Sequence, residues 1–278
     1  MKIRIAHSPD SDDAFMFYPL VAGEIKADGF QIEHVLKDIE TLNEEAFRGT
    51  YEVSAISFHA YPYVSDKYLV LPSGGSVGDG YGPILVAKDR LDGIRGKRIA
   101  VPGRLTTAYL VLKLYEPNFE EMVVPFDKVM DEIESGRVDV GLVIHEGQIS
   151  YKERGLEKIL DLGGWWKEKF NLPLPLGCNV VRRDLGRGVI KRIEELMRES
   201  VKYALTHMDK ALVYARDYAR EIKNSEEKTK RFVSMYVNQR TVDYGEDGRK
   251  AVRFLLSLGR ERGIVRVDIP HVMFSDEI

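Results

Sequence analysis

The stretch Arg98-Ile99-Ala100-Val101-Pro102-Gly103-Arg104-Leu105-Thr106-Thr107-Ala108-Tyr109-Leu110 decides the fold class of this chain. It is typical of a short buried strand, a turn that contains proline, and an amphipathic helix. The same order occurs in Arg4-Ile5-Ala6-His7-Ser8-Pro9-Asp10-Ser11-Asp12-Asp13-Ala14-Phe15-Met16. In both stretches, eight positions separate the alanine of the strand from the alanine in the first turn of the helix. This equal spacing favours an internal duplication.

A second pair of similar segments follows the first. Gly49-Thr50-Tyr51-Glu52-Val53-Ser54-Ala55-Ile56 resembles Gly136-Arg137-Val138-Asp139-Val140-Gly141-Leu142-Val143, because an acidic residue comes three positions after the glycine and an apolar strand follows. We expect a capping box formed by Thr41 and Glu44 in the helix before the first glycine. Both glycines suit the left-handed backbone that ends a helix. The chain is therefore expected to contain two α/β lobes of one plan.

Two connections would join these lobes. A glycine-rich segment at 73–83 precedes one strand pattern, and Leu-Pro-Leu-Pro-Leu-Gly at 172–177 precedes another. Glycine tolerates large changes of φ and ψ, so the first segment is a candidate hinge or binding loop. We predict that residues 1–86 and 178–278 form lobe one and that residues 87–177 form an inserted lobe two.

The chain is helical by pattern from about Asp184 onward. Further helices are expected around Lys210–Ile222, Glu226–Val237 and Asp247–Leu258, and all of them should pack on lobe one. The first helix of this region carries an apolar stripe with the spacing of an amphipathic helix. The stripe consists of Ile190, Ile193, Leu196, Met197, Val201 and Ala204.

Composition and charge exclude several classes of protein. The 278 residues are 44% hydrophobic and carry a formal net charge of −3, as is ordinary for a globular protein. The nearly balanced charge gives no excess of basic residues of the kind that binds nucleic acid. No apolar run is long enough to span a membrane. The N-terminus enters a strand pattern without the apolar stretch of a signal peptide, so we expect a cytoplasmic protein. Cys178 is the single cysteine, which excludes an internal disulfide.

Four loops that follow strand patterns are candidates for the ligand site. In open α/β sheets, ligands bind beyond the carboxyl ends of the strands. Two facing lobes would bring four such ends into one cleft. The loops are Ser8–Asp13, Ser57–His59, Gly103–Thr107 and His145–Gln148.

Two of these loops begin helices but differ in chemistry. The backbone N–H groups and the helix dipole at Gly103–Thr107 favour an anion such as a carboxylate or phosphate, and Thr106 or Thr107 can add a hydroxyl donor. The alternative is plain helix capping by threonine. The loop Ser8–Asp13 offers carboxylates instead, which either cap the helix or accept hydrogen bonds from substrate hydroxyls.

His145 follows an apolar strand pattern at its carboxyl end. A neutral imidazole there can act as a general base near pH 7, or it can be a histidine that is merely hydrogen-bonded. His7 and His59 hold similar positions and are second candidates. The sequence shows no metal-ligand spacing and no nucleotide-binding fingerprint, so we expect neither a metal nor a cofactor.

Both tryptophans lie in Gly163-Gly164-Trp165-Trp166. They can stack on an aromatic or sugar-like substrate as part of a lid, or they can pack the core of lobe two. Because large aromatic side chains usually bury their area in a core, we favour packing.

Several of these segments together resemble one enzyme family. They are Asp38–Asn43, Ser73–Gly75, Val101–Tyr109, Gly141–Glu146 and Leu162–Gly177. The most specific motifs among them are Pro-Gly-Arg-x-Thr-Thr-Ala and Ile-His-Glu. On these segments the chain resembles the 1,4-dihydroxy-6-naphthoate synthases, which act in the futalosine pathway of menaquinone biosynthesis. The resemblance implies a type 2 periplasmic-binding-protein-like fold with a cleft between two lobes.

The resemblance also implies an activity and a set of site residues. The implied enzyme is a lyase that converts cyclic dehypoxanthinyl futalosine, a small carboxylated substrate, to 1,4-dihydroxy-6-naphthoate without a cofactor. The histidine of the Ile-His-Glu motif, His145, is the implied base. The resemblance implies that Thr106 and Thr107 bind the substrate and that Ala55, Ile56 and Ser57 line the site. We also expect Ala108, Ser8 and Asp13 to bind the substrate.

The first loop departs from the family pattern. Many bacterial members carry Cys-Pro-Asn-Asp-Thr-Phe there, whereas this chain has Asp10-Ser11-Asp12-Asp13-Ala14-Phe15. The change leaves the substrate contacts of lobe one open and is compatible with a subfamily that takes another substrate. The alternatives are a lyase similar to chorismate dehydratase and a binding or sensor protein for a small anion. The Thr-Thr and Ile-His-Glu motifs favour the synthase, and the sequence does not indicate an oligomeric state.

Overall fold

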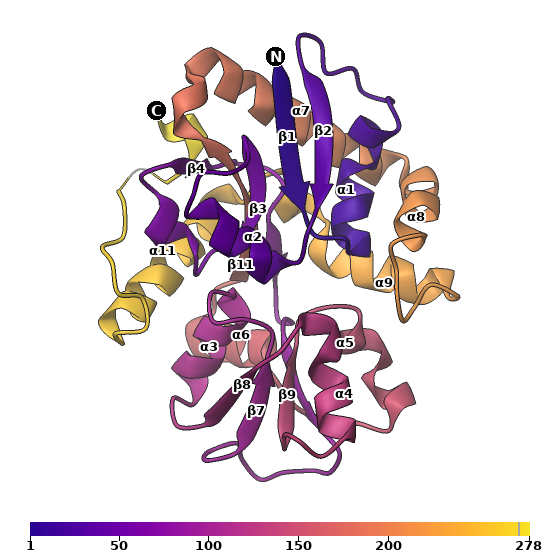
Figure 1. Ribbon diagram of the computed structural model, residues 1–278, viewed down its shortest axis with the longest axis vertical. Coiled ribbons are helices and arrows are strands. Elements are labelled where there is room, and N and C mark those ends of the chain that lie inside the picture. Colours follow the sequence, from indigo (N-terminus) through magenta and orange to yellow (C-terminus); the bar gives the residue numbers. More distant parts are fainter. Residues whose placement is uncertain (272) are drawn as a thin grey trace.

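The computed structural model describes residues 1–271 and 273–278. Two β-sheets lie one above the other, with helices around each (Figure 1). The upper sheet has the strand order β2-β1-β3-β11-β4, and β5 pairs with β11. Its strands are β1 (Lys2–His7), β2 (Gln31–Leu36), β3 (Val53–Ser57), β4 (Tyr68–Val70), β5 (Ser76–Gly78) and β11 (Leu174–Arg182).

The lower sheet repeats this plan, with the order β8-β7-β9-β6-β10. In each sheet the first three strands are parallel, and the next two run antiparallel to their neighbours. The registers correspond as well, since Ile5 lies opposite Val53 and Ile99 lies opposite Val140. This agreement supports the internal duplication. The strands are β6 (Ile84–Ala87), β7 (Arg98–Val101), β8 (Glu120–Val123), β9 (Val140–Val143) and β10 (Glu157–Asp161).

The chain crosses between the sheets twice, once between β5 and β6 and once before β11. The division into 1–86 plus 178–278 and 87–177 stays a prediction. Strand pairing places β6 from Ile84 in the lower sheet and β11 from Leu174 in the upper sheet. The chain therefore crosses between the sheets a few residues before each of the predicted boundaries, 86/87 and 177/178.

Helices lie around both sheets, and the later helices α7, α8 and α9 lie beside the upper sheet (Figure 1). All six residues of the apolar stripe of α7 are buried, as predicted. The helices are α1 (Ser11–Val21), α2 (Ile39–Ala46), α3 (Thr107–Tyr115), α4 (Val129–Glu134), α5 (Gly147–Ser150), α6 (Leu162–Phe170), α7 (Arg187–Thr206), α8 (Met208–Arg216), α9 (Glu226–Tyr236), α10 (Gln239–Val242) and α11 (Gly245–Glu261).

Two expectations about the C-terminal helices were wrong. The helix expected at Lys210–Ile222 is α8, which ends at Arg216, because the following segment turns toward the cleft. Helix α11 does not pack on the first lobe alone. Leu256 belongs to the core of the upper sheet, whereas Leu255 packs in the core of the lower sheet. This helix therefore joins the two lobes.

The start of α2 also differs from the expected capping box. Asp38 is the N-cap residue, and its carboxylate accepts the backbone N–H of Thr41 at 3.0 Å. Thr41 is therefore the third residue of the helix and not its cap. The two glycines behave as predicted, with φ of 64° at Gly49 and 73° at Gly136.

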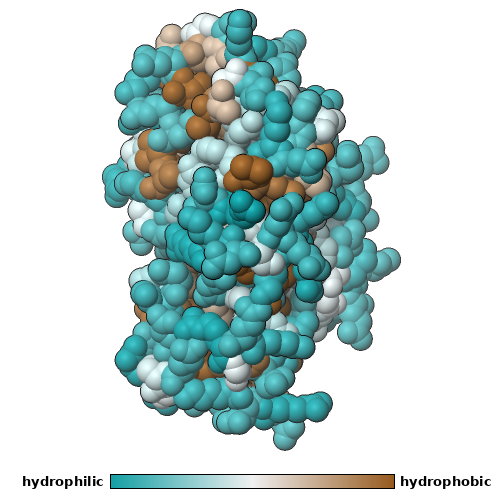
Figure 2. Space-filling view, turned by 90° about the vertical axis from the view of Figure 1, so that its right-hand side faces the viewer, coloured by the Kyte–Doolittle hydropathy of each residue, from teal (hydrophilic) through white to brown (hydrophobic). Residues whose placement is uncertain are grey.

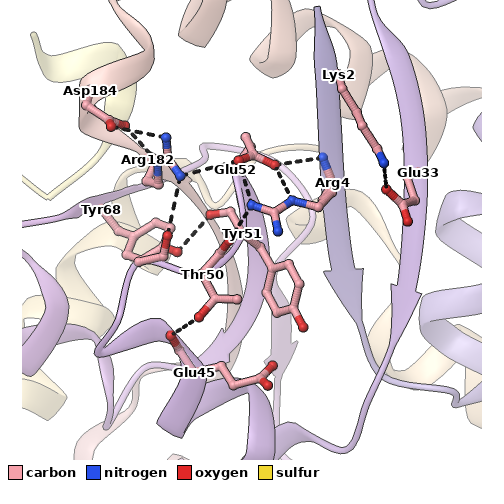
Figure 3. A network of polar contacts seen from close by, with 11 residues as sticks. Lys2, Arg4, Glu33, Glu45, Thr50, Tyr51, Glu52, Tyr68, Arg182 and Asp184 are labelled. Carbon is pink, nitrogen blue, oxygen red and sulfur yellow. Dashed lines mark hydrogen bonds and ion pairs between the residues drawn. The ribbon is translucent and has the colours of Figure 1, made fainter.

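An ion-pair network fixes β1, β3 and β11 relative to one another (Figure 3). The carboxylate of Glu52, just before β3, accepts hydrogen bonds from the guanidinium of Arg4 and also pairs with Arg182. Burial alone would raise the pKa of Glu52, but the hydrogen bonds from Arg4 outweigh burial and lower the pKa. These contacts hold together three strands that contribute to the site, β1 and β3 near their carboxyl ends and β11 through its first half.

The surface on the side of α8 and α9 is mostly hydrophilic, with hydrophobic side chains in separate groups (Figure 2). Among the large hydrophobic side chains that the structure describes, Val213 of α8 is the most exposed, at 64%. Among the residues that the structure describes, no helix combines the length and apolarity needed to cross a membrane.

Candidate active site

A pocket with an empty volume of about 790 Å³, including its open mouth, lies where the strand ends of the two lobes meet. The structure brings all eight expected substrate-binding residues to its lining; their role in binding stays a prediction. These eight are Ser8, Asp13, Ala55, Ile56, Ser57, Thr106, Thr107 and Ala108. The lining also contains Asp10 and Asp12 of the predicted loop Ser8–Asp13, and residues that sequence reasoning did not assign to the site: Ile144, Leu176, Asn179 and Tyr236.

The N-terminus of α3 forms one wall of the pocket. Thr106 caps the helix, since its hydroxyl accepts the N–H of Tyr109 at 3.2 Å. Thr107 bridges the lobes, because its hydroxyl donates to the carbonyl of Leu176 at 2.6 Å and accepts the N–H of His59 at 3.2 Å. Both hydroxyls are thus engaged within the protein. The donors that remain for an anion are the first-turn backbone N–H groups, which have no carbonyl partner in the helix itself.

Ser57, at the end of β3, is held by a side chain of α2. Its N–H donates to Asn43 Oδ1 at 2.8 Å, and Asn43 Nδ2 donates to the Ser57 hydroxyl at 3.3 Å. Asn43 is fully buried. On the same helix, Glu40 accepts the N–H of Leu105 in the opposite lobe at 3.0 Å. Helix α2 therefore positions both walls of the pocket.

The first loop turns three carboxyl groups toward the pocket. Asp13 accepts the N–H of Ser8 at 2.8 Å, and the Ser8 hydroxyl donates to Asp10 at 3.1 Å. Asp10 is the N-cap residue of α1, yet its side chain makes no capping hydrogen bond. Burial raises the pKa of Asp13 to about 7, and burial together with Asp13 and Asp10 raises the pKa of Asp12 well above its usual range. Near neutral pH this group of acids therefore retains protons.

His145 lies beside the pocket, at 7% exposure, and does not line it; its neighbour Ile144 does. Its Nδ1 accepts the N–H of Gly147 at 3.0 Å, which places the proton of the neutral ring on Nε2. Among the described residues, Nε2 has no hydrogen-bond partner that meets normal geometry. Burial lowers the pKa of His145, although Asp10 opposes this shift. The imidazole is therefore neutral at pH 7.

Glu146 connects the two lobes across the cleft. One carboxylate oxygen accepts the hydroxyl of Ser11 at 2.6 Å, and the other accepts the N–H of Arg220 at 2.9 Å. Burial raises the pKa of Glu146, and both hydrogen bonds oppose that shift. Nearby, Tyr236 donates to Gln148 Oε1 at 2.8 Å, which adds a further contact between the lobes. The structure is therefore that of a closed cleft.

The other candidate residues, His7, His59 and the tryptophan pair, pack against protein groups. His7 stacks on Phe17 with ring centroids 4.3 Å apart, and burial lowers its pKa to about 3. His59 is buried against the carbonyl of Thr106. Trp166 is fully buried and donates to the carbonyl of Pro173 at 3.1 Å, in agreement with core packing. Within residues 1–271 and 273–278, no three or more His, Cys, Asp or Glu side chains are grouped as ligands for a metal ion.

The similarity of this chain to known proteins extends over nearly its whole length. A family model described as menaquinone biosynthesis matches residues 3–261. The chain belongs to this family. It is 43% identical to a 1,4-dihydroxy-6-naphthoate synthase of Thermus thermophilus, over 94% of this chain and 95% of the relative. It is 34% identical to the synthase of that name from Streptomyces coelicolor, over 95% and 94%. This member of the menaquinone biosynthesis family is therefore an enzyme.

Solved structures confirm the predicted fold of this family member. A protein from Archaeoglobus fulgidus is 48% identical and superimposes with a TM-score of 0.91, covering 95% of this chain and 98% of its own. The alkanesulfonate-binding protein of Xanthomonas axonopodis pv. citri superimposes with a TM-score of 0.72 at 11% identity, over 99% and 96%. A Candida albicans protein with the generic periplasmic binding protein fold gives 0.64 at 14%, over 97% and 98%. The chain thus has a two-lobed periplasmic-binding-protein-like fold.

Proposed function

We propose that this enzyme is a carbon–carbon lyase that converts cyclic dehypoxanthinyl futalosine to 1,4-dihydroxy-6-naphthoate. The observation that carries the proposal is the closed pocket between the lobes, which has backbone donors on one wall and a neutral histidine beside it. Its two named relatives are 1,4-dihydroxy-6-naphthoate synthases. A cleft between two lobes is a usual binding place for a small substrate of this kind.

The substrate carboxylate would bind at the N-terminus of α3. The first-turn N–H groups of Thr107 and Ala108 point out of the helix, and the helix dipole favours negative charge there. The distant relative from Xanthomonas, which shares the fold, was solved with the sulfonate buffer MOPS bound. A fold that accommodates a sulfonate in one protein is well suited to a carboxylate in another.

His145 would be the base. It takes a proton from a hydroxyl of the sugar-derived part, and that oxygen becomes a carbonyl as the adjoining carbon–carbon bond breaks in a retro-aldol-like step. The electron pair of the bond stays with the ring, which becomes aromatic, and a small sugar fragment leaves. Aromatisation supplies the driving force, so the proposed step needs no cofactor. Because Nδ1 is engaged by Gly147, the ring must first give up that hydrogen bond and move its proton from Nε2 before Nε2 can act as the base.

Closure of the lobes would exclude water during this step. The contacts of Glu146 with Ser11 and with Arg220 bury the carboxylate at 3% exposure. A pocket closed in this way protects a reactive intermediate from hydrolysis. The substrate must enter and the product must leave through an open state of the same cleft.

Product analysis tests this function. Purified wild type, His145→Ala and His207→Ala are each incubated with cyclic dehypoxanthinyl futalosine, and 1,4-dihydroxy-6-naphthoate is measured. We expect wild-type turnover, a loss of about 10²- to 10⁴-fold for His145→Ala, and no change for the exposed His207→Ala. Absence of product from wild type would overturn the proposal, and parallel incubations with chorismate would then test the related lyase. Full activity of a folded His145→Ala would remove His145 as the base.

A further inference from the structure

Asn179 lies on β11 opposite Ala55 of β3, in the wall of the pocket. Its side chain is 1% exposed. The amide nitrogen donates to the carbonyl of Gly74 at 2.7 Å. The amide oxygen has no hydrogen-bond partner among residues 1–271 and 273–278. A polar atom so buried is costly unless something else supplies a donor.

The orientation of this amide is fixed by its surroundings. Turning the amide over would place its oxygen against the carbonyl oxygen of Gly74, and two acceptors repel each other. Gly74 itself has φ of 86°, and an added Cβ would lie 2.7 Å from Asn179 Nδ2. The glycine thus permits a close approach that holds the nitrogen on the backbone. The oxygen is left for an occupant of the pocket.

The walls of the pocket differ in hydrogen-bonding character. The N-terminus of α3 presents N–H donors, which suit a carboxylate. Asn179 Oδ1 is an acceptor, and a carboxylate placed there would meet a second acceptor without a proton between them. The part of a ligand that lies against Asn179 must therefore carry O–H or N–H donors.

We propose that Asn179 is a specificity-determining residue whose Oδ1 accepts a hydrogen bond from a hydroxyl of the sugar-derived part of the substrate. The inference rests on the proposed function, because it takes the identity of the substrate from it. It sets the orientation in the pocket: the carboxylate lies at α3 and the hydroxyl-bearing part lies against β11. The residue binds the substrate and takes no part in proton transfer.

The test compares a ligand that has these hydroxyls with one that lacks them. Values of kcat/KM for cyclic dehypoxanthinyl futalosine and of the inhibition constant for 2-naphthoate are measured for wild type, Asn179→Leu and Asn179→Asp. We expect Asn179→Leu to lower kcat/KM by about 10- to 100-fold and to change 2-naphthoate inhibition less than twofold. Burial favours the protonated carboxyl in Asn179→Asp, so that its O–H can donate to the carbonyl of Gly74 while its other oxygen stays an acceptor. This variant should therefore retain most of the kcat/KM. Thermal unfolding shows whether each variant is folded.

Several outcomes would overturn the inference. An equal loss for both ligands would indicate a defect of pocket shape, and no loss for either would mean that water alone occupies Asn179 Oδ1. If Asn179→Leu does not fold, the test rests on Asn179→Asp. A folded Asn179→Asp whose kcat/KM falls as far as we expect for Asn179→Leu would contradict the acceptor role of Oδ1. If wild type binds the substrate without turnover, the proposed reaction fails, and calorimetric dissociation constants decide on Asn179 instead. If wild type does not bind it, both proposals fail.

Discussion

Ser11 and Glu146 are 135 positions apart in the chain, yet the hydroxyl of Ser11 donates to the carboxylate of Glu146 at 2.6 Å. Ser11 begins α1 of the upper lobe, and Glu146 follows β9 of the lower lobe. The contact therefore exists only while the cleft is closed. It stabilises the closed state relative to the open one, and that balance can be measured.

Ser11→Ala should shift the enzyme toward the open state. Loss of one hydrogen bond of about 1 kcal/mol corresponds to a change of about fivefold in the closed population. We expect KM to rise by about this factor, with a smaller effect on kcat, and the radius of gyration in X-ray scattering to increase. Ser135→Ala, which removes an exposed hydroxyl after α4 in the lower lobe, is the control. Unchanged scattering and KM in Ser11→Ala would show that the contact does not hold the cleft.

Asp13→Asn should stabilise the protein at alkaline pH. The pKa of Asp13 is raised to about 7 in the folded state, whereas an unfolded chain ionises this carboxyl near pH 4. Between these two pKa values the folded state binds one more proton than the unfolded state. Ionisation of the buried Asp13 therefore lowers the free energy of unfolding. This loss is absent below about pH 4, grows as the pH rises, and is complete above about pH 7. Asparagine removes the charge and keeps an oxygen for the Ser8 N–H. The melting temperature should exceed that of wild type at pH 8 but not at pH 4.

The control for this prediction is Asp28→Asn, which neutralises an exposed aspartate. Its melting temperature should follow that of wild type at both pH values. A gain for Asp13→Asn that is equal at pH 4 and pH 8 would contradict the burial of an ionisable Asp13.

Glu52→Gln should destabilise the upper sheet. Glu52 is 8% exposed and accepts from Arg4, while Arg182 also pairs with it (Figure 3). We expect a loss of about 1–3 kcal/mol in the free energy of unfolding at pH 7, measured by urea denaturation. Because the pKa of Glu52 is lowered by its partners, its contribution is present above the usual pKa of glutamate. The difference from wild type should therefore shrink as the pH falls below about 4.

Glu33→Gln is the matched control for Glu52→Gln. Glu33 pairs with Lys2 on the same sheet, at side-chain exposures of 45% and 59% (Figure 3). Exposed pairs of this kind contribute about 0–1 kcal/mol. A loss in Glu33→Gln as large as in Glu52→Gln would contradict the assignment of stability to the buried network.

Gly163→Ala and Gly164→Ala should have opposite effects, although both glycines lie in the first turns of α6. A Cβ at Gly163 would lie 2.0 Å from the backbone of Tyr81, in the crossing between the sheets. At Gly164 the nearest atoms are 3.7 Å away. We expect a loss of about 1–3 kcal/mol or more for Gly163→Ala, and for Gly164→Ala a gain of up to about 1 kcal/mol from helix propensity. Equal melting temperatures would contradict this packing.

The parts of the fold that could be predicted have local signals. The strand–turn–helix units follow from periodicity over a dozen residues, and the glycines at 49 and 136 follow from the need for positive φ. The cap of α2 was wrong because Asp38 and Thr41 are both good N-cap residues, and only the three-dimensional structure decides between them. The helix expected to reach Ile222 shows the same limit, since its last residues have helical spacing but turn toward Glu146.

The candidate site could be predicted only as far as loops at strand ends. His145 could be found from its position after β9, but its hydrogen bond with Gly147 could not. Glu146, Arg220 and Asn179 meet partners from distant parts of the chain, and no local pattern encodes such contacts. Asn179 in particular lies within a strand, where an asparagine has no periodic signature. Its role depends on which strand lies beside it.

The late position of β11 in the chain has a consequence for biosynthesis. The lower sheet is complete in sequence once β10 ends at Asp161, whereas β3 pairs on its second side only with β11, which begins at Leu174. During translation the strands of the lower sheet can therefore pair first, while β3 of the upper sheet still has one unpaired edge. The pocket wall that contains Asn179 is made after the lower sheet, and Tyr236 of α9 joins the lining later still, so the nascent chain cannot complete its pocket until the ribosome has passed α9.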